Sequence, residues 1–147
     1  MDEIKIENFA REYPASPFPI FRTLTTQETE LIRGSIAKRL GLCPSISSLD
    51  VVCTVFEKAI IIPDTSAEDD NFNLENLIRE LDIKAQEKVF INWYRFDNID
   101  EISLDDFSRY FDDLWYPAAD AIDIFDDTLE WILYVDYSGS ISVLKFQ

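Results

Sequence analysis

The segment KVFINWYRF, residues 88–96, decides the fold of this chain because it is the strongest strand sequence in it. Its side chains are largely apolar on both faces, which is typical of a strand at the centre of a sheet. Three more strands are predicted after it, at 121–126, 129–137 and 141–146, with a tight turn at 138–140 between the last two. We therefore expect an antiparallel sheet in the C-terminal half.

Helices are predicted before the strand at 88–96, and one more helix is predicted in the connection between the strands at 88–96 and 121–126. A capping box at 25–28 begins a helix whose apolar residues recur at helical spacing until Gly41 ends it. A short helix is expected at 74–81, where an asparagine can cap its start. The inserted helix is expected at 104–114, after a serine cap and before Pro117.

Residues 48–58 fit two structures. The run VVCTVF, 51–56, is rich in β-branched residues and favours a strand. The polar residues of the segment instead recur at offsets of four, seven and eight, which places them on one face of a helix. These residues are Asp50, Thr54, Glu57 and Lys58. We expect a helix at 48–58, followed by a strand at 59–62.

Length and composition indicate one domain. The chain has 147 residues, of which 47% are hydrophobic, so it can bury a substantial core. The order of the predicted elements indicates an α+β fold, with a helical N-terminal half and an antiparallel β-sheet with an inserted helix in the C-terminal half. We expect residues 1–147 to form a single globular domain, on which residues 1–24 pack as a proline-containing arm.

The chain is strongly acidic. It has 29 Asp and Glu residues against 13 Lys and Arg residues, which gives a net charge of −16. Nucleic acids and anionic membranes attract basic surfaces, so the charge argues against both as partners. A field of this sign attracts a basic protein partner. The simplest alternative is that the acids only keep the protein soluble.

The residue types that are missing exclude most familiar active sites. The chain has no histidine, which removes Ser-His-Asp and Cys-His catalysis and histidine metal ligands. Its three glycines form no phosphate-binding loop, and Cys43 and Cys53 have neither metal-binding nor redox spacing. We expect no catalytic residue, metal site or cofactor, and hence no enzyme. The N-terminus does not have the pattern of a signal peptide, which together with two reduced thiols predicts a cytoplasmic location.

The acids are concentrated in one part of the chain. Residues 97–130 contain 12 acids and one base, Arg109, and residues 90–137 contain 13 of the 20 aromatic residues. Carboxylates that steer a partner and aromatics that anchor it are typical of a protein interface. The alternative is that the aromatics form the core and the acids its solvated side. The predicted partner-binding residues are Asp105, Asp106, Asp112, Asp113, Trp115, Tyr116, Asp120, Asp123, Asp126 and Asp127.

Other functions compete with this interpretation. The segment DTSAEDDNFNLE, residues 64–75, has oxygen-bearing residues at five calcium-ligating positions of an EF-hand, but Asp69 occupies the position that requires glycine. Two acids could also act as a glycosidase pair, although 29 acids produce such pairs by chance. A carboxylate- or metal-dependent enzyme is therefore one alternative. A DNA mimic of the anti-restriction or anti-CRISPR kind, which occupies a basic nucleic-acid channel, is another.

The run LWYPAADAIDIFDDTLEWILYVDYSGSISV, residues 114–143, resembles the C-terminal part of small bacterial proteins. Some of these are immunity proteins for polymorphic toxins, including those of contact-dependent growth inhibition systems. The residues that carry the resemblance are Trp115, Tyr116, Pro117, Asp120, Ile124, Phe125, Asp126, Trp131 and the final hairpin. Many related tails have a histidine near the last strand, where this chain has Asp136-Tyr137. The resemblance implies a cytoplasmic inhibitor that neutralises a basic cognate toxin, commonly a nuclease, by covering its active site or an adjacent surface.

Overall fold

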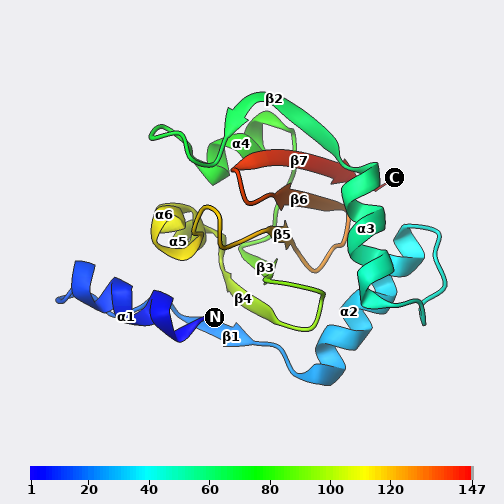
Figure 1. Ribbon diagram of the computed structural model, residues 1–147, viewed down its shortest axis with the longest axis horizontal. Coiled ribbons are helices and arrows are strands. Elements are labelled where there is room, and N and C mark those ends of the chain that lie inside the picture. The colour runs from blue at the N-terminus through cyan, green and yellow to red at the C-terminus, as the bar shows by residue number, and fades with distance from the viewer. Residues whose placement is uncertain (147) are drawn as a thin grey trace.

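One antiparallel sheet of seven strands forms the centre of the computed structural model, which describes residues 1–146 (Figure 1). The strand order is β1-β4-β3-β5-β6-β7-β2. In chain order the strands are β1 (Phe21–Thr23), β2 (Ile60–Ser66), β3 (Lys88–Asn92), β4 (Ile99–Ser103), β5 (Ile122–Phe125), β6 (Trp131–Val135) and β7 (Ser140–Lys145). The helices are α1 (Glu3–Glu12), α2 (Thr26–Arg39), α3 (Ser48–Lys58), α4 (Leu74–Glu80), α5 (Leu104–Arg109) and α6 (Phe111–Leu114). The predicted α+β fold is confirmed.

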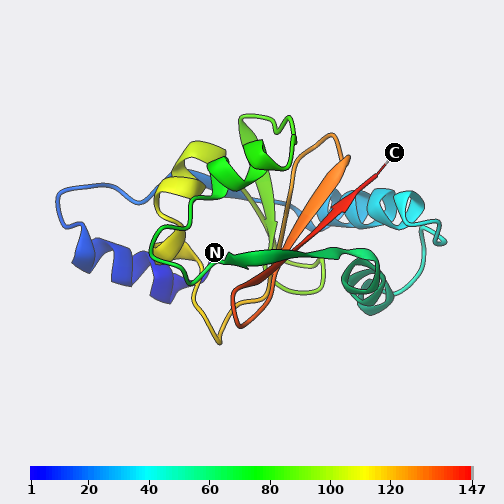
Figure 2. The ribbon, with the colours of Figure 1, turned by 90° about the horizontal axis from the view of Figure 1, so that it is seen from above.

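The helices lie in two layers, one on each side of the sheet. Seen from above, α4, α5 and α6 lie on one side, and α2 and α3 lie on the other (Figure 2). Successive side chains of a strand point to opposite faces of the sheet and so reach both layers. Ile122 and Ile124 of β5 belong to the first core cluster, and Phe125 belongs to the second. β3 is apolar on both faces, with Val89 and Ile91 in the first cluster and Phe90 in the second, as the sequence of residues 88–92 indicates.

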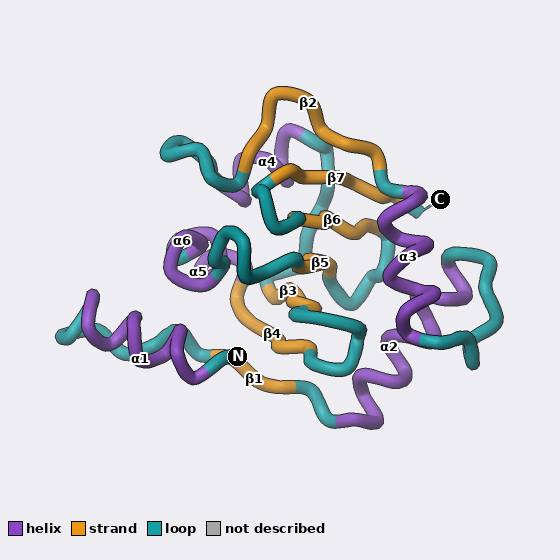
Figure 3. The backbone as a smooth tube through the Cα atoms, viewed as in Figure 1, coloured by secondary structure: helices purple, strands orange, loops and turns teal. Residues whose placement is uncertain are grey.

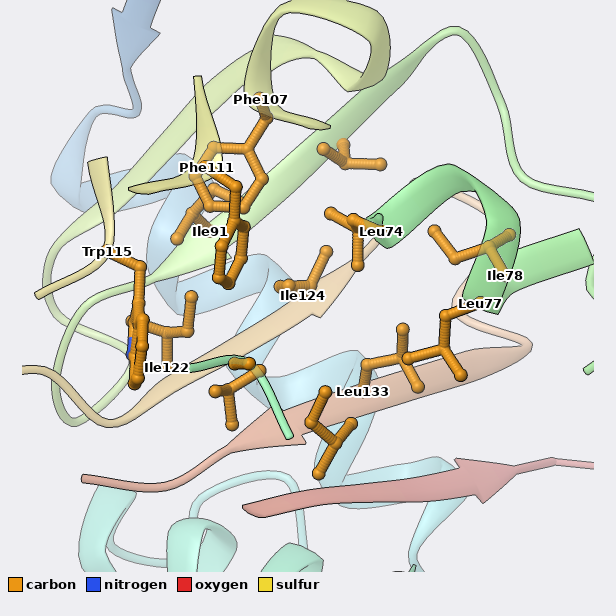
Figure 4. Close-up of a cluster of buried hydrophobic side chains, with 14 of the residues drawn as sticks. Leu74, Leu77, Ile78, Ile91, Phe107, Phe111, Trp115, Ile122, Ile124 and Leu133 are labelled. Carbon is orange, nitrogen blue, oxygen red and sulfur yellow. The ribbon is translucent and has the colours of Figure 1, made fainter. Parts of the chain in front are cut away.

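The first core joins the short helices to the sheet (Figure 4). Leu74, Leu77 and Ile78 of α4 and the aromatic rings of α5 and α6 point toward the side chains of β3, β5 and β6. The rings of Phe107 and Phe111 meet edge to face, with 5.5 Å between their centroids. This packing holds the acidic residues of α5 and α6 at the outside of the same helices.

The strand predicted at 88–96 ends early, at Asn92. The side-chain oxygen of Asn92 accepts hydrogen bonds from the backbone N–H groups of Tyr94 and Phe96, at 3.3 and 2.9 Å, and these bonds turn the chain. Phe96 adopts a positive φ of 55°, and its ring packs near that of Phe125, with 6.1 Å between centroids. The chain then returns as β4, a strand that is not predicted from the sequence.

The N-terminal arm is more structured than the sequence predicts. Residues 3–12 form α1, and residues 21–23 form β1, which pairs with β4 at the edge of the sheet. The connection between them is extended and runs back beside α1 (Figure 3). Phe9 is 1% exposed and anchors α1 through ring contacts with neighbouring aromatics. Its partners are Tyr13, Phe18 and Tyr110.

Two further elements differ from their predictions in length. The helix at 48–58 is confirmed and begins at the cap Ser47, but the strand after it continues to Ser66, paired with β7. The helix predicted at 104–114 is interrupted at Tyr110, which leaves helical geometry, and so forms α5 and α6. Of the helices among residues 1–146, none has the length and apolar character needed to cross a membrane.

Candidate functional site

The ten predicted partner-binding residues do not form one surface. Three of them are buried, two belong to a recess that α1 fills, and five remain at the surface. The buried ones are Trp115, Asp123 and Asp126, and the prediction is wrong for these three. The two in the recess are Tyr116 and Asp120. Those at the surface are Asp105, Asp106, Asp112, Asp113 and Asp127.

Asp126 has a structural role. Its side chain is fully buried, and its Oδ2 accepts hydrogen bonds from the backbone N–H of Gln86 and the indole Nε1 of Trp131, each at 3.0 Å. Its Oδ1 accepts from the backbone N–H of Thr128 at 3.0 Å and from the Thr128 hydroxyl. Donors from three segments therefore surround one carboxylate, which holds the loop between β5 and β6 in place and cannot reach a partner.

Asp123 is buried on the opposite face of β5 from Ile122 and Ile124. Its Oδ2 accepts a hydrogen bond of 2.9 Å from the side-chain nitrogen of Asn92 on β3, and its backbone pairs with that of Tyr134 on β6. Burial raises the pKa of Asp123 to about 7, although the hydrogen bond from Asn92 acts in the opposite direction. The alternation of acids in AIDIFD therefore marks a strand with both faces covered.

Trp115 belongs to the core. It is 2% exposed, its ring stacks on that of Phe111 with 5.7 Å between centroids, and its indole N–H donates to the backbone oxygen of Asp120 at 3.1 Å. Trp115 follows Phe107 and Phe111 at intervals of four residues, so it continues the buried apolar stripe that they form. That spacing favours a core position for Trp115, and the structure places it there.

Tyr116 and Asp120 form a recess together with Trp93, and Lys5 of α1 fills it. The Lys5 ammonium lies 2.5 Å from Oδ2 of Asp120. It is 3.8 Å from the ring centroid of Tyr116 and 5.1 Å from that of Trp93. Ammonium groups bind to aromatic faces and carboxylates by electrostatic attraction. We call Trp93, Tyr116 and Asp120 the ammonium cage.

A second buried ammonium shares a carboxylate with Trp93. The amino group of Met1 is 2.5 Å from Oδ2 of Asp100, and both groups are fully buried. The same carboxylate accepts from the Trp93 indole at 2.8 Å and from the Thr23 hydroxyl at 2.6 Å. Sequence reasoning missed Lys5, Trp93 and Asp100. Lys5 and Phe9 are four residues apart, and this spacing could have indicated that both lie on the inner face of a helix.

The surface acids gather most closely on α6. Asp112 is exposed, and its pKa is raised by partial burial and by the nearby negative charges of Asp113 and Asp70. Asp70 comes from the loop before α4, which packs on α6 through Phe72 and Phe111, with 5.0 Å between ring centroids. We call Asp70, Asp112 and Asp113 the acidic cluster. Among residues 1–146, no ion pair involves any of the three.

The remaining surface acids lie apart from this cluster or are already paired. Asp105 of α5 forms an ion pair of 2.8 Å with Arg109 one turn later. Asp106 is half-buried at the start of the same helix, where its backbone N–H donates to the capping Ser103. Asp127 lies in the loop between β5 and β6, whose Thr128 oxygen accepts from Arg39 of α2. Asp127 therefore belongs to a different region of the surface.

The two helical layers differ in charge. Residues 26–58, which contain α2 and α3, have four acids and four bases and are neutral as a group. The rest of the chain therefore carries the whole net charge of −16. The helices on the other side of the sheet, α4, α5 and α6, each have more acids than bases (Figure 2).

The segment predicted as a possible EF-hand has another structure. Residues 60–66 are strand β2, and Asn73 caps α4 by accepting from the backbone N–H of Asn76 at 2.9 Å. A recess of about 200 Å³ between them is lined by Asp64, Asp69 and Glu80, among others. Among residues 1–146, no three His, Cys, Asp or Glu side chains are grouped so that they could hold a metal ion. The segment is thus not a helix–loop–helix motif.

No family model matches this chain, and no curated protein or solved structure matches it closely enough to indicate a relationship.

Proposed function

We propose that this chain is a cytoplasmic, acidic protein-binding inhibitor of the immunity type. Its partner is a basic toxin domain, most simply a nuclease, whose active site or adjacent surface it covers. The resemblance of residues 114–143 to the tails of immunity proteins supports this form of the proposal. The surface that supports it is the acidic cluster.

The observation that carries the proposal is the crowding of Asp70, Asp112 and Asp113. Partial burial and the negative charges of Asp113 and of Asp70, which comes from a distant segment, raise the pKa of Asp112. Within residues 1–146, the side chain of Asp113 accepts one hydrogen bond, from the neutral Tyr13 hydroxyl at 2.9 Å. Like charges held close together destabilise one another, and a cation from a partner relieves that repulsion. A partner with clustered Lys or Arg therefore gains affinity here without competing against internal ion pairs.

The mechanism follows from the chemistry of a nuclease site. Such a site uses cationic side chains to bind phosphates, and a row of carboxylates presents similar charge and acceptor oxygens. Tyr13, Phe72 and Tyr110 are half-buried around the acidic cluster and can supply apolar contact at its margin. The carboxylates would steer the encounter, and the aromatic margin would slow dissociation.

The test compares two variants with equal changes of charge. Asp70→Asn, Asp112→Asn and Asp113→Asn together neutralise the acidic cluster. Glu30→Gln, Glu57→Gln and Glu130→Gln neutralise three exposed acids elsewhere. We measure binding to the protein encoded by the neighbouring reading frame, and protection of cells that express that protein.

We expect the cluster variant to lose at least about tenfold in affinity at low salt, and the matched control to lose much less. Equal affinities of the two variants would contradict the role of the cluster. Failure of the wild-type chain to protect against its neighbour would contradict the immunity function. Competition with DNA for several unrelated DNA-binding proteins would instead support a DNA mimic.

A further inference from the structure

Lys5 is an unusual residue in this fold. Among residues 1–146 it is the one lysine or arginine that is fully buried, at 2% exposure. Burying an ammonium costs free energy unless a carboxylate and other favourable groups surround it. The ammonium cage supplies both, with Asp120 at 2.5 Å and the ring of Tyr116 at 3.8 Å. The cage is therefore a complete binding site for an alkylammonium group, at present occupied by the chain itself.

The walls of the cage are held in place by contacts that do not involve Lys5. Oδ2 of Asp120 also accepts the backbone N–H of Tyr116 at 2.8 Å, and the backbone N–H of Ala118 donates to the oxygen of Tyr137 at 2.8 Å. The indole of Trp93 is oriented by its hydrogen bond to Asp100. The loop at 116–120 and Trp93 therefore keep their positions when the ammonium changes.

The segment that carries Lys5 is attached to the body by the Met1 amino group and by side chains, without backbone pairing to the sheet among residues 1–146. In the part of the chain that the structure describes, the backbone hydrogen bonds of residues 1–16 stay within that segment. The Met1 amino group is also paired with Asp100 at 2.5 Å, and Phe9, Asn8 and Tyr13 provide further contacts, of which Asn8 donates to the Tyr116 hydroxyl at 3.1 Å. Figure 1 shows α1 beside α6 and outside the stack of strands. Elements held in this way open at lower free energy than strands inside a sheet.

We propose that the ammonium cage is a lysine-binding site in which Lys5 acts as an internal, exchangeable ligand. A lysine side chain of a basic protein partner takes the place of Lys5, and α1 moves away from Trp93 and Tyr116. This inference rests on the proposed function for the identity of the partner. The cage lies next to α6, so one basic surface can contact the acidic cluster and insert a lysine into the cage.

The first test uses n-butylammonium, which reproduces the lysine side chain from Cβ to the ammonium, and requires no partner. Lys5→Ala empties the cage, and Lys38→Ala removes an exposed lysine of α2 as the matched control. We expect n-butylammonium to raise the melting temperature of K5A by about 5 °C and to shift the Trp93 indole resonance saturably. Both responses should be much smaller in K38A, where Lys5 competes for the cage, and absent in K5A combined with Asp120→Asn. A folded K5A protein that responds no more than K38A would overturn the site.

The second test addresses exchange in the wild-type protein, and it stands even if K5A does not fold. Amide hydrogen exchange of residues 5–9 is measured in n-butylammonium chloride and in sodium chloride of equal concentration. We expect faster exchange of these amides in the butylammonium salt, with the amides of β3 unchanged. Equal exchange in both salts would refute displacement of α1. Because neither test contains a protein partner, their failure is distinct from a failure of the proposed function.

Discussion

Asp123 is the residue at which protonation and stability are most directly linked. Burial raises its pKa to about 7 from an ordinary value of 3.8, so the folded protein holds a proton that the unfolded chain releases in this range. A carboxyl group of this kind contributes stability that is fully present below its unfolded pKa. The contribution is lost as the pH rises through its folded pKa. We therefore expect the free energy of unfolding to decrease as the pH rises from about 3.8 to about 7.

Asp123→Asn removes this titration and keeps an acceptor for the Asn92 amide. Relative to the wild type, D123N should gain about 2–4 kcal/mol of stability when the pH is raised from about 5 to about 8, as measured by urea unfolding. Asp113→Asn, at the surface of α6, is the control and should show no comparable gain. A D123N effect that does not change with pH would show that the wild-type carboxyl titrates normally.

At the scale of single elements, α1 is fixed by one aromatic anchor. Phe9 is 1% exposed among three rings, whereas Ile4 on the same helix is 50% exposed. We expect Phe9→Ala to lower the free energy of unfolding by about 3–5 kcal/mol, and Ile4→Ala by less than about 1 kcal/mol. Urea unfolding measures both. A small effect of F9A would mean that α1 already detaches readily from the body.

At the scale of the whole molecule, the uneven charge makes stability depend on salt. The net charge is −16, and residues 26–58 contribute none of it, so the acids repel one another within the remaining part of the chain. Salt screens this repulsion between exposed charges. We expect the melting temperature to rise with sodium chloride. The rise should be smaller by about 2–4 °C in the cluster variant than in the E30Q, E57Q and E130Q control. Equal salt dependence would show that the cluster does not carry concentrated repulsion.

Which acids reach the surface could be predicted only in part from the sequence. Asp105 and Asp112 lie opposite the apolar stripe of a helix, and helical periodicity correctly places them outside. Asp123 and Asp126 occur in a run of alternating acids, a pattern that also describes a half-exposed strand. Their burial depends on the strands and loops that cover them. One of these is the segment that contains Gln86, whose backbone N–H donates to Asp126. Strand periodicity contains no information about those distant segments.

The sequence by itself determined the α+β class, the capped helices that begin after Thr25, Asn73 and Ser103, and the uneven distribution of charge along the chain. Each depends on spacing and composition within a few residues, where backbone geometry is local. Only the tertiary structure decided that Lys5 meets Asp120, 115 residues away, and that α6 brings Asp112 to Asp70. Contacts of this kind arise when distant segments pack to bury their apolar faces, and local patterns do not specify which segments meet.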